Sequence, residues 1–225
     1  MGLIKYGMSV KQCLGSMILF IVVGIAFEMM SVLGNGVTFW NRSLDFGALF
    51  LYSAAMYPAQ ILMSLDISGM VQASPYKKKI QTDAMSFASL CGNLTALAIL
   101  LLIRGLGAWI LPERAPLIWG MLPAIGIMGL GLSIMGAIMY KFYILSIIVL
   151  AVIFAIFAGI NSYQDIMAVE YDSGIMGSMS VPLGVAFCLA MILLGNAAQY
   201  LIARALYRRP FSKGAFGSAA GKKFV

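Results

Sequence analysis

Six stretches of mostly apolar residues follow one another along the chain. They run from Ser16 to Leu33, from Phe46 to Leu65, from Met85 to Ile103, from Leu117 to Met139, from Tyr143 to Ile160 and from Val181 to Ile202. A helix of about 20 apolar residues is long enough to cross the hydrocarbon of a bilayer. The pattern therefore predicts an all-α integral membrane protein with six transmembrane helices. We expect one membrane domain over residues 1–209 and a flexible basic tail over residues 210–225.

The positions of lysine and arginine predict how these helices are oriented. If the N-terminus lies in the cytoplasm, twelve of the 15 basic residues fall on the cytoplasmic side, and only Arg42, Arg104 and Arg114 fall outside. Basic residues are enriched in cytoplasmic loops of membrane proteins. An even number of spans, with both termini in the cytoplasm, preserves this division.

The composition excludes several classes of function. Hydrophobic residues make up 62% of the chain and charged residues 10%, whereas a soluble domain has about 25% charged residues. The net charge of +7 resides in the loops and the tail, so we expect no nucleic-acid partner. The chain has no histidine, which removes His-based zinc sites and Ser-His catalysis. Its three cysteines have no CxxC spacing, and we expect neither a metal site nor a catalytic residue.

The connection between the second and third stretches contains a predicted short helix. Gly69 breaks the helix just after the second stretch, and Ser74 followed by Pro75 is typical of an N-cap and a first helical position. The helix would cover residues 75–83 and carry three consecutive lysines: Lys77, Lys78 and Lys79. Two interpretations are open. The segment is either a basic loop that only fixes the topology, or a docking helix that presses on a cytoplasmic partner.

The six-span layout, this capped basic helix and the string ISGMVQASPYKKK from Ile67 to Lys79 resemble the permease subunits of ABC-2 type transporters. They are most similar to small stand-alone permeases of peptide and multidrug exporters in the cytoplasmic membrane of Gram-positive bacteria. The resemblance implies that residues 75–83 form a coupling helix, seated in a groove of a separate ATPase subunit. Six residues would make this contact: Ser74, Pro75, Tyr76, Lys77, Lys78 and Lys79.

The resemblance also implies roles for other segments. The stretch from Met1 to Gln12 would be a membrane-surface helix before the first span, and residues 161–180 would be an external re-entrant segment. The outer gate would include Tyr163, Asp165, Glu170 and Tyr171. The permease would pair with a second, identical or different permease, and an amphipathic peptide, lipid or drug would be exported between the two halves.

The chain itself has no ATP-binding motif. A Walker A loop requires GxxxxGK followed by Ser or Thr, and the string GSAAGKK from Gly217 to Lys223 has a shorter gap and no hydroxyl after its lysine. ATP and Mg²⁺ would therefore bind to the partner subunit, and this chain would not be an enzyme.

Polar residues inside the predicted spans are candidates for a translocation pathway. Glu28 is the only acidic residue within a predicted span, and no lysine or arginine lies within another, so we expect no buried ion pair. Either a hydrogen bond satisfies Glu28, or it has a functional role. The pathway candidates are Glu28, Asn93, Asn196 and Gln199. The last three are also typical of residues that hold helices together by hydrogen bonds.

Two further patterns predict the shape of the spans. Pro58 and Pro123 are expected to kink the second and fourth spans. The fourth span contains several glycines, at positions 120, 126, 129, 131 and 136, and is expected to pack closely against its neighbours.

Two other classes of function stay open beside the exporter permease. The chain is alternatively a proton-coupled secondary transporter that uses Glu28, or a membrane assembly protein that transports nothing. Loss of transport on Glu28→Gln, with sensitivity to uncouplers, would favour the proton-coupled transporter.

Overall fold

The structure, a computed structural model, describes residues 2–33, 46–57, 75–139, 141–142, 148, 151 and 180–208. Every regular element in these ranges is a helix. Four helical runs in them are long and apolar enough to cross a membrane: Leu14–Leu33, Lys77–Ile110, Pro112–Met139 and Val181–Leu206. The prediction of an all-α chain with membrane-spanning helices is confirmed, and the count of six stays a prediction. Most of the predicted fifth span and residues 58–65 of the predicted second span lie outside the described residues.

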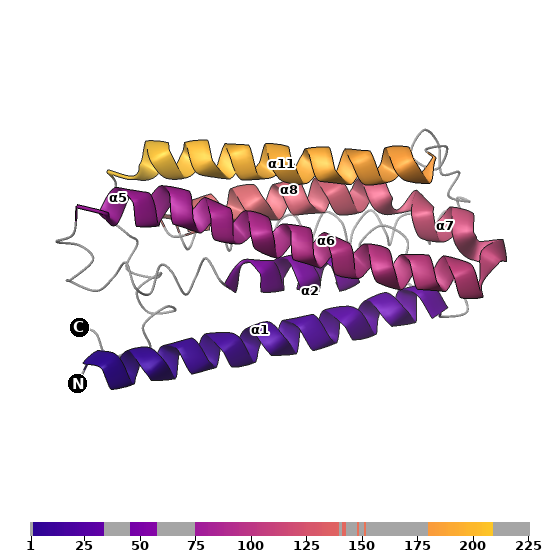
Figure 1. The fold of residues 1–225 in the computed structure, drawn as a ribbon, viewed down its shortest axis with the longest axis horizontal. Helices are drawn as coiled ribbons and strands as arrows, with labels where there is room; N and C mark the ends of the chain where they lie inside the picture. The colour runs from indigo at the N-terminus through magenta and orange to yellow at the C-terminus, as the bar shows by residue number, and fades with distance from the viewer. Residues whose placement is uncertain are drawn as a thin grey trace.

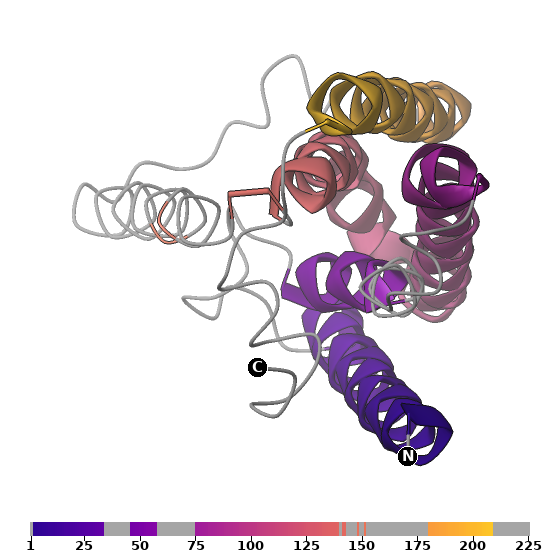
Figure 2. The ribbon, with the colours of Figure 1, turned by 90° about the vertical axis from the view of Figure 1, so that its left-hand side faces the viewer.

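Within the described ranges, five longer helices form an elongated bundle (Figures 1 and 2). They are α1 (Gly2–Leu33), α2 (Phe46–Ala55), α6 (Met85–Ile110), α8 (Leu122–Met139) and α11 (Val181–Leu206). In Figure 2, α2 lies between α1 on one side and α6 and α8 on the other, and α11 covers α8 and α6 on the side away from α1. The core between them is apolar and includes Leu51, Tyr52, Leu100, Leu122, Ile125 and Ile192.

Contacts between the helices fix their directions. Where α8 and α11 touch, the residue numbers increase in the same direction along both helices. The contacting pairs are Leu122 with Gly184, Gly126 with Cys188, Gly129 with Ile192 and Gly136 with Gln199. These two helices are therefore parallel. α6 is antiparallel to α11, because Ser86 near the start of α6 is bonded to Asn196 in the second half of α11. The start of α1, the start of α6 and the end of α11 accordingly lie at one end of the bundle (Figure 1).

Apolar side chains cover the outside of the bundle as well as its inside. On α1, α6 and α11 many large ones are exposed, among them Ile18, Leu19, Met30, Leu102, Trp109, Leu193 and Leu201. A water-soluble monomer does not normally expose apolar surface along three helices. A lipid environment accounts for this surface, as the composition predicts.

The glycines of the predicted fourth span allow the close packing expected of them. A Cβ atom on Gly126 would lie 3.1 Å from the Cα of Cys188, and one on Gly129 would lie 3.1 Å from the ring of Tyr52. α11 contributes Gly195, whose Cβ would lie 2.8 Å from the Cα of Leu130. Gly131 is different, because a Cβ there would have no heavy atom within 4 Å.

The third span begins and ends differently from the prediction. A three-residue turn of helix, α5 (Lys77–Lys79), continues through a π-helical turn, η1 (Ile80–Ala84), into α6, so the helical run is 34 residues long. The predicted coupling helix is thus not a separate helix that ends at residue 83. Helix starts at Lys77 after Tyr76, which makes no side-chain capping bond, and not at Pro75. No proline or glycine lies between Lys77 and Gly92 to stop the helix.

Two other boundaries need correction. α1 is one helix from Gly2 to Leu33, so the residues expected to form a separate surface helix continue directly into the first span. The predicted fourth span is interrupted at Met121, between α7 (Ala115–Gly120) and α8. Pro123 explains the interruption, since it has no N–H to donate to the carbonyl four residues earlier. The interruption lies where a kink was predicted for Pro123, whereas Pro58 lies outside the described residues.

Candidate functional site

A buried ion pair joins α1 to α6. The Nε of Arg104 lies 2.7 Å from Oε1 of Glu28, and the two side chains are 2% and 0% exposed. Nη1 of Arg104 also donates a hydrogen bond to the backbone carbonyl of Ile118 in α7. A single guanidinium therefore holds three helices together at the end of the bundle where α7 lies.

A neighbouring glycine leaves room for this pair. A Cβ on Gly47, in the first turn of α2, would lie 2.5 Å from Oε2 of Glu28 and 2.7 Å from its Cβ. One turn beyond the pair, Gly107 of α6 faces Val32 of α1, and a Cβ there would overlap the valine side chain. Small residues on α2 and α6 thus let α1 come close enough for its carboxylate to reach Arg104.

The expectation that Glu28 has no basic partner within a span is wrong. It rested on a third span that ended at Ile103, with Arg104 in an external loop. The helix continues to Ile110, so Arg104 lies inside it. Two signals in the sequence marked the true end: Trp109, a residue typical of the membrane interface, and Pro112, which begins the short 3₁₀ helix η2 (Pro112–Arg114).

Near the middle of the bundle a second polar contact joins α6 to α8. Nδ2 of Asn93 donates to Oγ of Ser133 over 2.9 Å, and that hydroxyl donates to the carbonyl of Gly129 over 2.8 Å. Both side chains are 2% exposed. The interhelical hydrogen bond expected of Asn93 is present.

Further along α6, toward Lys77, a third polar contact joins it to α11. Nδ2 of Asn196 donates to the backbone carbonyl of Ser86 over 2.7 Å. One turn further along α11, the buried Gln199 faces Gly136 of α8. Gln199 is 1% exposed and Ser86 5%.

The four predicted pathway residues therefore divide into two groups. Asn93, Asn196 and Gln199 lie along the shared interface of α6, α8 and α11. Glu28 lies on α1, and its partner Arg104 is eleven residues beyond Asn93 on α6, about 16 Å along the helix axis. The four candidates therefore lie at two separate places, a polar helix interface and a buried ion pair.

The predicted coupling residues lie at the free end of the third span. Pro75, Tyr76, Lys78 and Lys79 are exposed and Lys77 is half-buried. In the π-helical turn that follows, Oγ1 of the buried Thr82 donates to the carbonyl of Lys78 over 2.8 Å. Ser74 and the four predicted outer-gate residues, Tyr163, Asp165, Glu170 and Tyr171, lie outside the described residues.

No protein-family model, curated protein or solved structure matches the chain. Among the described residues, no three His, Cys, Asp or Glu side chains are grouped so that they could hold a metal ion.

Proposed function

We propose that the chain is the membrane-spanning permease subunit of an ATP-binding-cassette exporter. A separate subunit binds ATP and Mg²⁺ and hydrolyses the nucleotide. Two permease subunits, identical or different, form the pathway for an amphipathic peptide, lipid or drug. The resemblance of the segment from Ile67 to Lys79 to ABC-2 permeases supports this proposal, and so does the arrangement of the third span.

The observation that carries the proposal is the position of the three lysines. They form the first turn of a 34-residue helical run whose far half holds Arg104. A partner that grips this exposed turn would push or pull the helical run along its axis, and a sideways movement of the turn would bend the run at the π-helical turn that follows the lysines. The buried contacts at Ser86, Asn93 and Arg104 would pass that displacement to α11, α8 and α1.

The π-helical turn between the lysines and α6 is a natural place for the helix to bend. Such single π turns occur within α-helices, often at functional sites. η1 contacts α11, so bending there would change how the start of the third span lies on α11. The π-helical turn therefore separates the lysines that would dock on the partner from α6, which packs in the bundle.

The ion pair weighs against the proton-coupled alternative. That alternative requires Glu28 to take up and release protons during transport. Glu28 is instead paired at 2.7 Å with a buried guanidinium that also binds α7. Protonation of Glu28 would leave Arg104 without its countercharge inside the bundle, which is costly.

Co-purification tests the proposal. The tagged chain is expressed in its native host, extracted in mild detergent and compared with two triple variants. One carries Lys77→Glu, Lys78→Glu and Lys79→Glu. The other carries the same change of charge in the tail: Lys213→Glu, Lys222→Glu and Lys223→Glu. The three preparations are assayed for ATP hydrolysis, and the bound proteins are identified by mass spectrometry.

We expect an ATPase subunit to accompany the wild-type chain and the tail variant, and to be lost from the variant at residues 77–79. The matched tail variant separates a docking contact from a general effect of charge. An ATPase that stays bound after reversal of Lys77, Lys78 and Lys79 would refute the docking site. If no ATPase accompanies the wild-type chain, the exporter proposal is wrong.

A further inference from the structure

The interface of α6, α8 and α11 is lined by uncharged polar groups over several helical turns. From the middle of the bundle toward the Lys77 end these are Asn93 with Ser133, then Ser86 with Asn196, then Gln199. We call this set the polar interface. On α6 it ends at Ser86, seven residues after Lys79, which is about two helical turns or about 10 Å along the axis. The polar interface therefore reaches close to the end of the bundle predicted to face the cytoplasm.

Two side-chain atoms in the polar interface have no hydrogen-bond partner among the described residues. They are Oγ of Ser86 and Oε1 of Gln199. Both are buried, one on α6 and one on α11, and the hydrogen bond from Asn196 to the carbonyl of Ser86 joins these two helices one turn before Gln199. Leaving such atoms unpaired in a dry interior is unfavourable, and buried polar groups in proteins are almost always bonded to protein or to ordered water. These two atoms call for a ligand that both donates and accepts hydrogen bonds.

The chemistry of the polar interface limits what that ligand is. Its five side chains are amides and hydroxyls, without a charge. An ion bound there would lack a countercharge in a low-dielectric interior. A Cβ on Gly136 would lie 2.9 Å from Cε of Met56 and 3.6 Å from Nε2 of Gln199, so little space is open there and the ligand must be small. A small neutral molecule that forms two to four hydrogen bonds fits these conditions, and water is that molecule.

We propose that the polar interface binds water, which enters from the end of the bundle where Lys77 lies. Water donates to Oε1 of Gln199 and exchanges hydrogen bonds with Oγ of Ser86. The half of the bundle near Lys77 is thereby hydrated between α6 and α11, while the opposite half is closed by Glu28 and Arg104. This proposal does not depend on an ATPase partner, because it concerns the chain by itself.

Thiol chemistry tests the hydration directly. Reaction with methyl methanethiosulfonate requires the thiolate, which forms readily in water and poorly in lipid or a dry core. The reagent is small and uncharged, so it reaches both surroundings. Single cysteines are introduced after Cys13→Ser, Cys91→Ser and Cys188→Ser, of which the last keeps a donor for the carbonyl of Leu122. The chain is studied in phospholipid vesicles.

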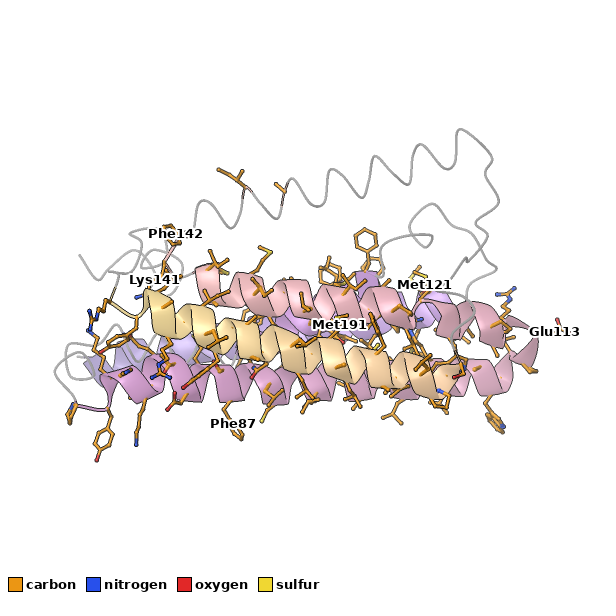
Figure 3. The ribbon with its side chains drawn as sticks, turned by 90° about the horizontal axis from the view of Figure 1, so that it is seen from above. Phe87, Glu113, Met121, Lys141, Phe142 and Met191 are labelled. Carbon is orange, nitrogen blue, oxygen red and sulfur yellow. The ribbon has the colours of Figure 1, made fainter. Side chains whose placement is uncertain are left out.

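Each test position has a matched control at almost the same depth. Ser86→Cys is compared with Phe87→Cys, because Phe87 is the next residue on α6 but points away from α11 and is 69% exposed on the outer surface (Figure 3). Gln199→Cys is compared with Leu201→Cys, which is 63% exposed on α11. Because one pair of variants lies on α6 and the other on α11, the test still works if one of the variants does not fold.

We expect the cysteines at 86 and 199 to react about tenfold faster, or more, than those at 87 and 201. An anionic methanethiosulfonate, added from one side only, should then reach them faster from the cytoplasmic side. Equal, slow rates within both pairs would show that the polar interface is dry and would overturn the proposal. This result would leave the co-purification of an ATPase, and hence the proposed function, untouched.

Discussion

At the scale of single residues, Glu28 and Arg104 are two buried charges that form an ion pair between α1 and α6. Each is costly to move from water into a bilayer, and together they compensate each other. The prediction placed Arg104 in an external loop, because hydropathy alone does not distinguish an arginine inside a span from one just beyond its end. Glu28 itself was recognised as unusual from the sequence. Its partner could only be identified once the end of the third helix and its contact with α1 were known.

Loss of the Glu28 charge should destabilise the protein strongly. Glu28→Gln leaves Arg104 buried without its countercharge, a change that costs about 3–5 kcal/mol in proteins. Thermal unfolding in detergent should show this, whereas Glu113→Gln, at an exposed site on η2, should have almost no effect. The double variant Glu28→Gln with Arg104→Met removes both charges and should recover most of the loss. Additive losses in the double variant would show that the two side chains are not coupled.

Loss of the hydrogen bond between Asn93 and Ser133 should lower the stability less than loss of the Glu28 charge, and a control substitution is possible on the same helix. Asn93→Leu removes a bond between α6 and α8, and such bonds in membrane proteins contribute about 0.6 kcal/mol on average, up to about 1.7. Thr95→Ala removes a bond to Cys91 within α6, at an exposed site. In denaturation by mixed micelles, Asn93→Leu should lower the free energy of unfolding measurably more than Thr95→Ala. An equal effect would mean that the Asn93 bond does not hold the two helices together.

At the scale of helices, the sequence predicted the close packing better than it predicted the helix boundaries. The glycines of the fourth span predicted close packing, and Gly126 and Gly129 do lie against α11 and α2. The sequence could not predict which glycines would be in contact, because all of them satisfy the same spacing. It also could not predict that α5, η1 and α6 form one run, since Ser74 and Pro75 are good starting signals whether or not the helix later stops.

Two glycines on neighbouring helices should therefore respond in opposite ways to the same substitution. Gly195→Ala places a Cβ 2.8 Å from the Cα of Leu130, a backbone atom that cannot move aside easily, so α8 and α11 must separate. Gly131→Ala meets open space and should stabilise α8 by up to about 1 kcal/mol, because alanine is the better helix former. Unfolding of the two variants by denaturant should show opposite signs. Stabilisation by Gly195→Ala would contradict the close packing of α8 on α11.

The directions of the helices bear on the topology of the whole molecule. α8 and α11 are parallel, so the chain leaves α8 at the end where α6 begins and enters α11 at the opposite end. Figure 3 places Lys141 and Glu113 at opposite ends of the molecule. Two parallel helices that both cross a membrane require the connecting chain to cross it once more. The predicted fifth span, over residues 143–160, is the apolar stretch available for that crossing, in keeping with the predicted even number of spans.

Cysteine labelling from one side of the membrane tests this topology. In a chain whose three native cysteines are replaced by serine, Glu113→Cys and Asp172→Cys should react with a membrane-impermeant maleimide in intact cells. Lys141→Cys should react only after the membrane is permeabilised, because it follows α8 at the end where the lysines of α5 lie. If the stretch 143–160 did not cross, positions 141 and 172 would be labelled from the same side. In that case α8 and α11 could not both span the membrane as parallel helices, and the six-span arrangement would have to be replaced.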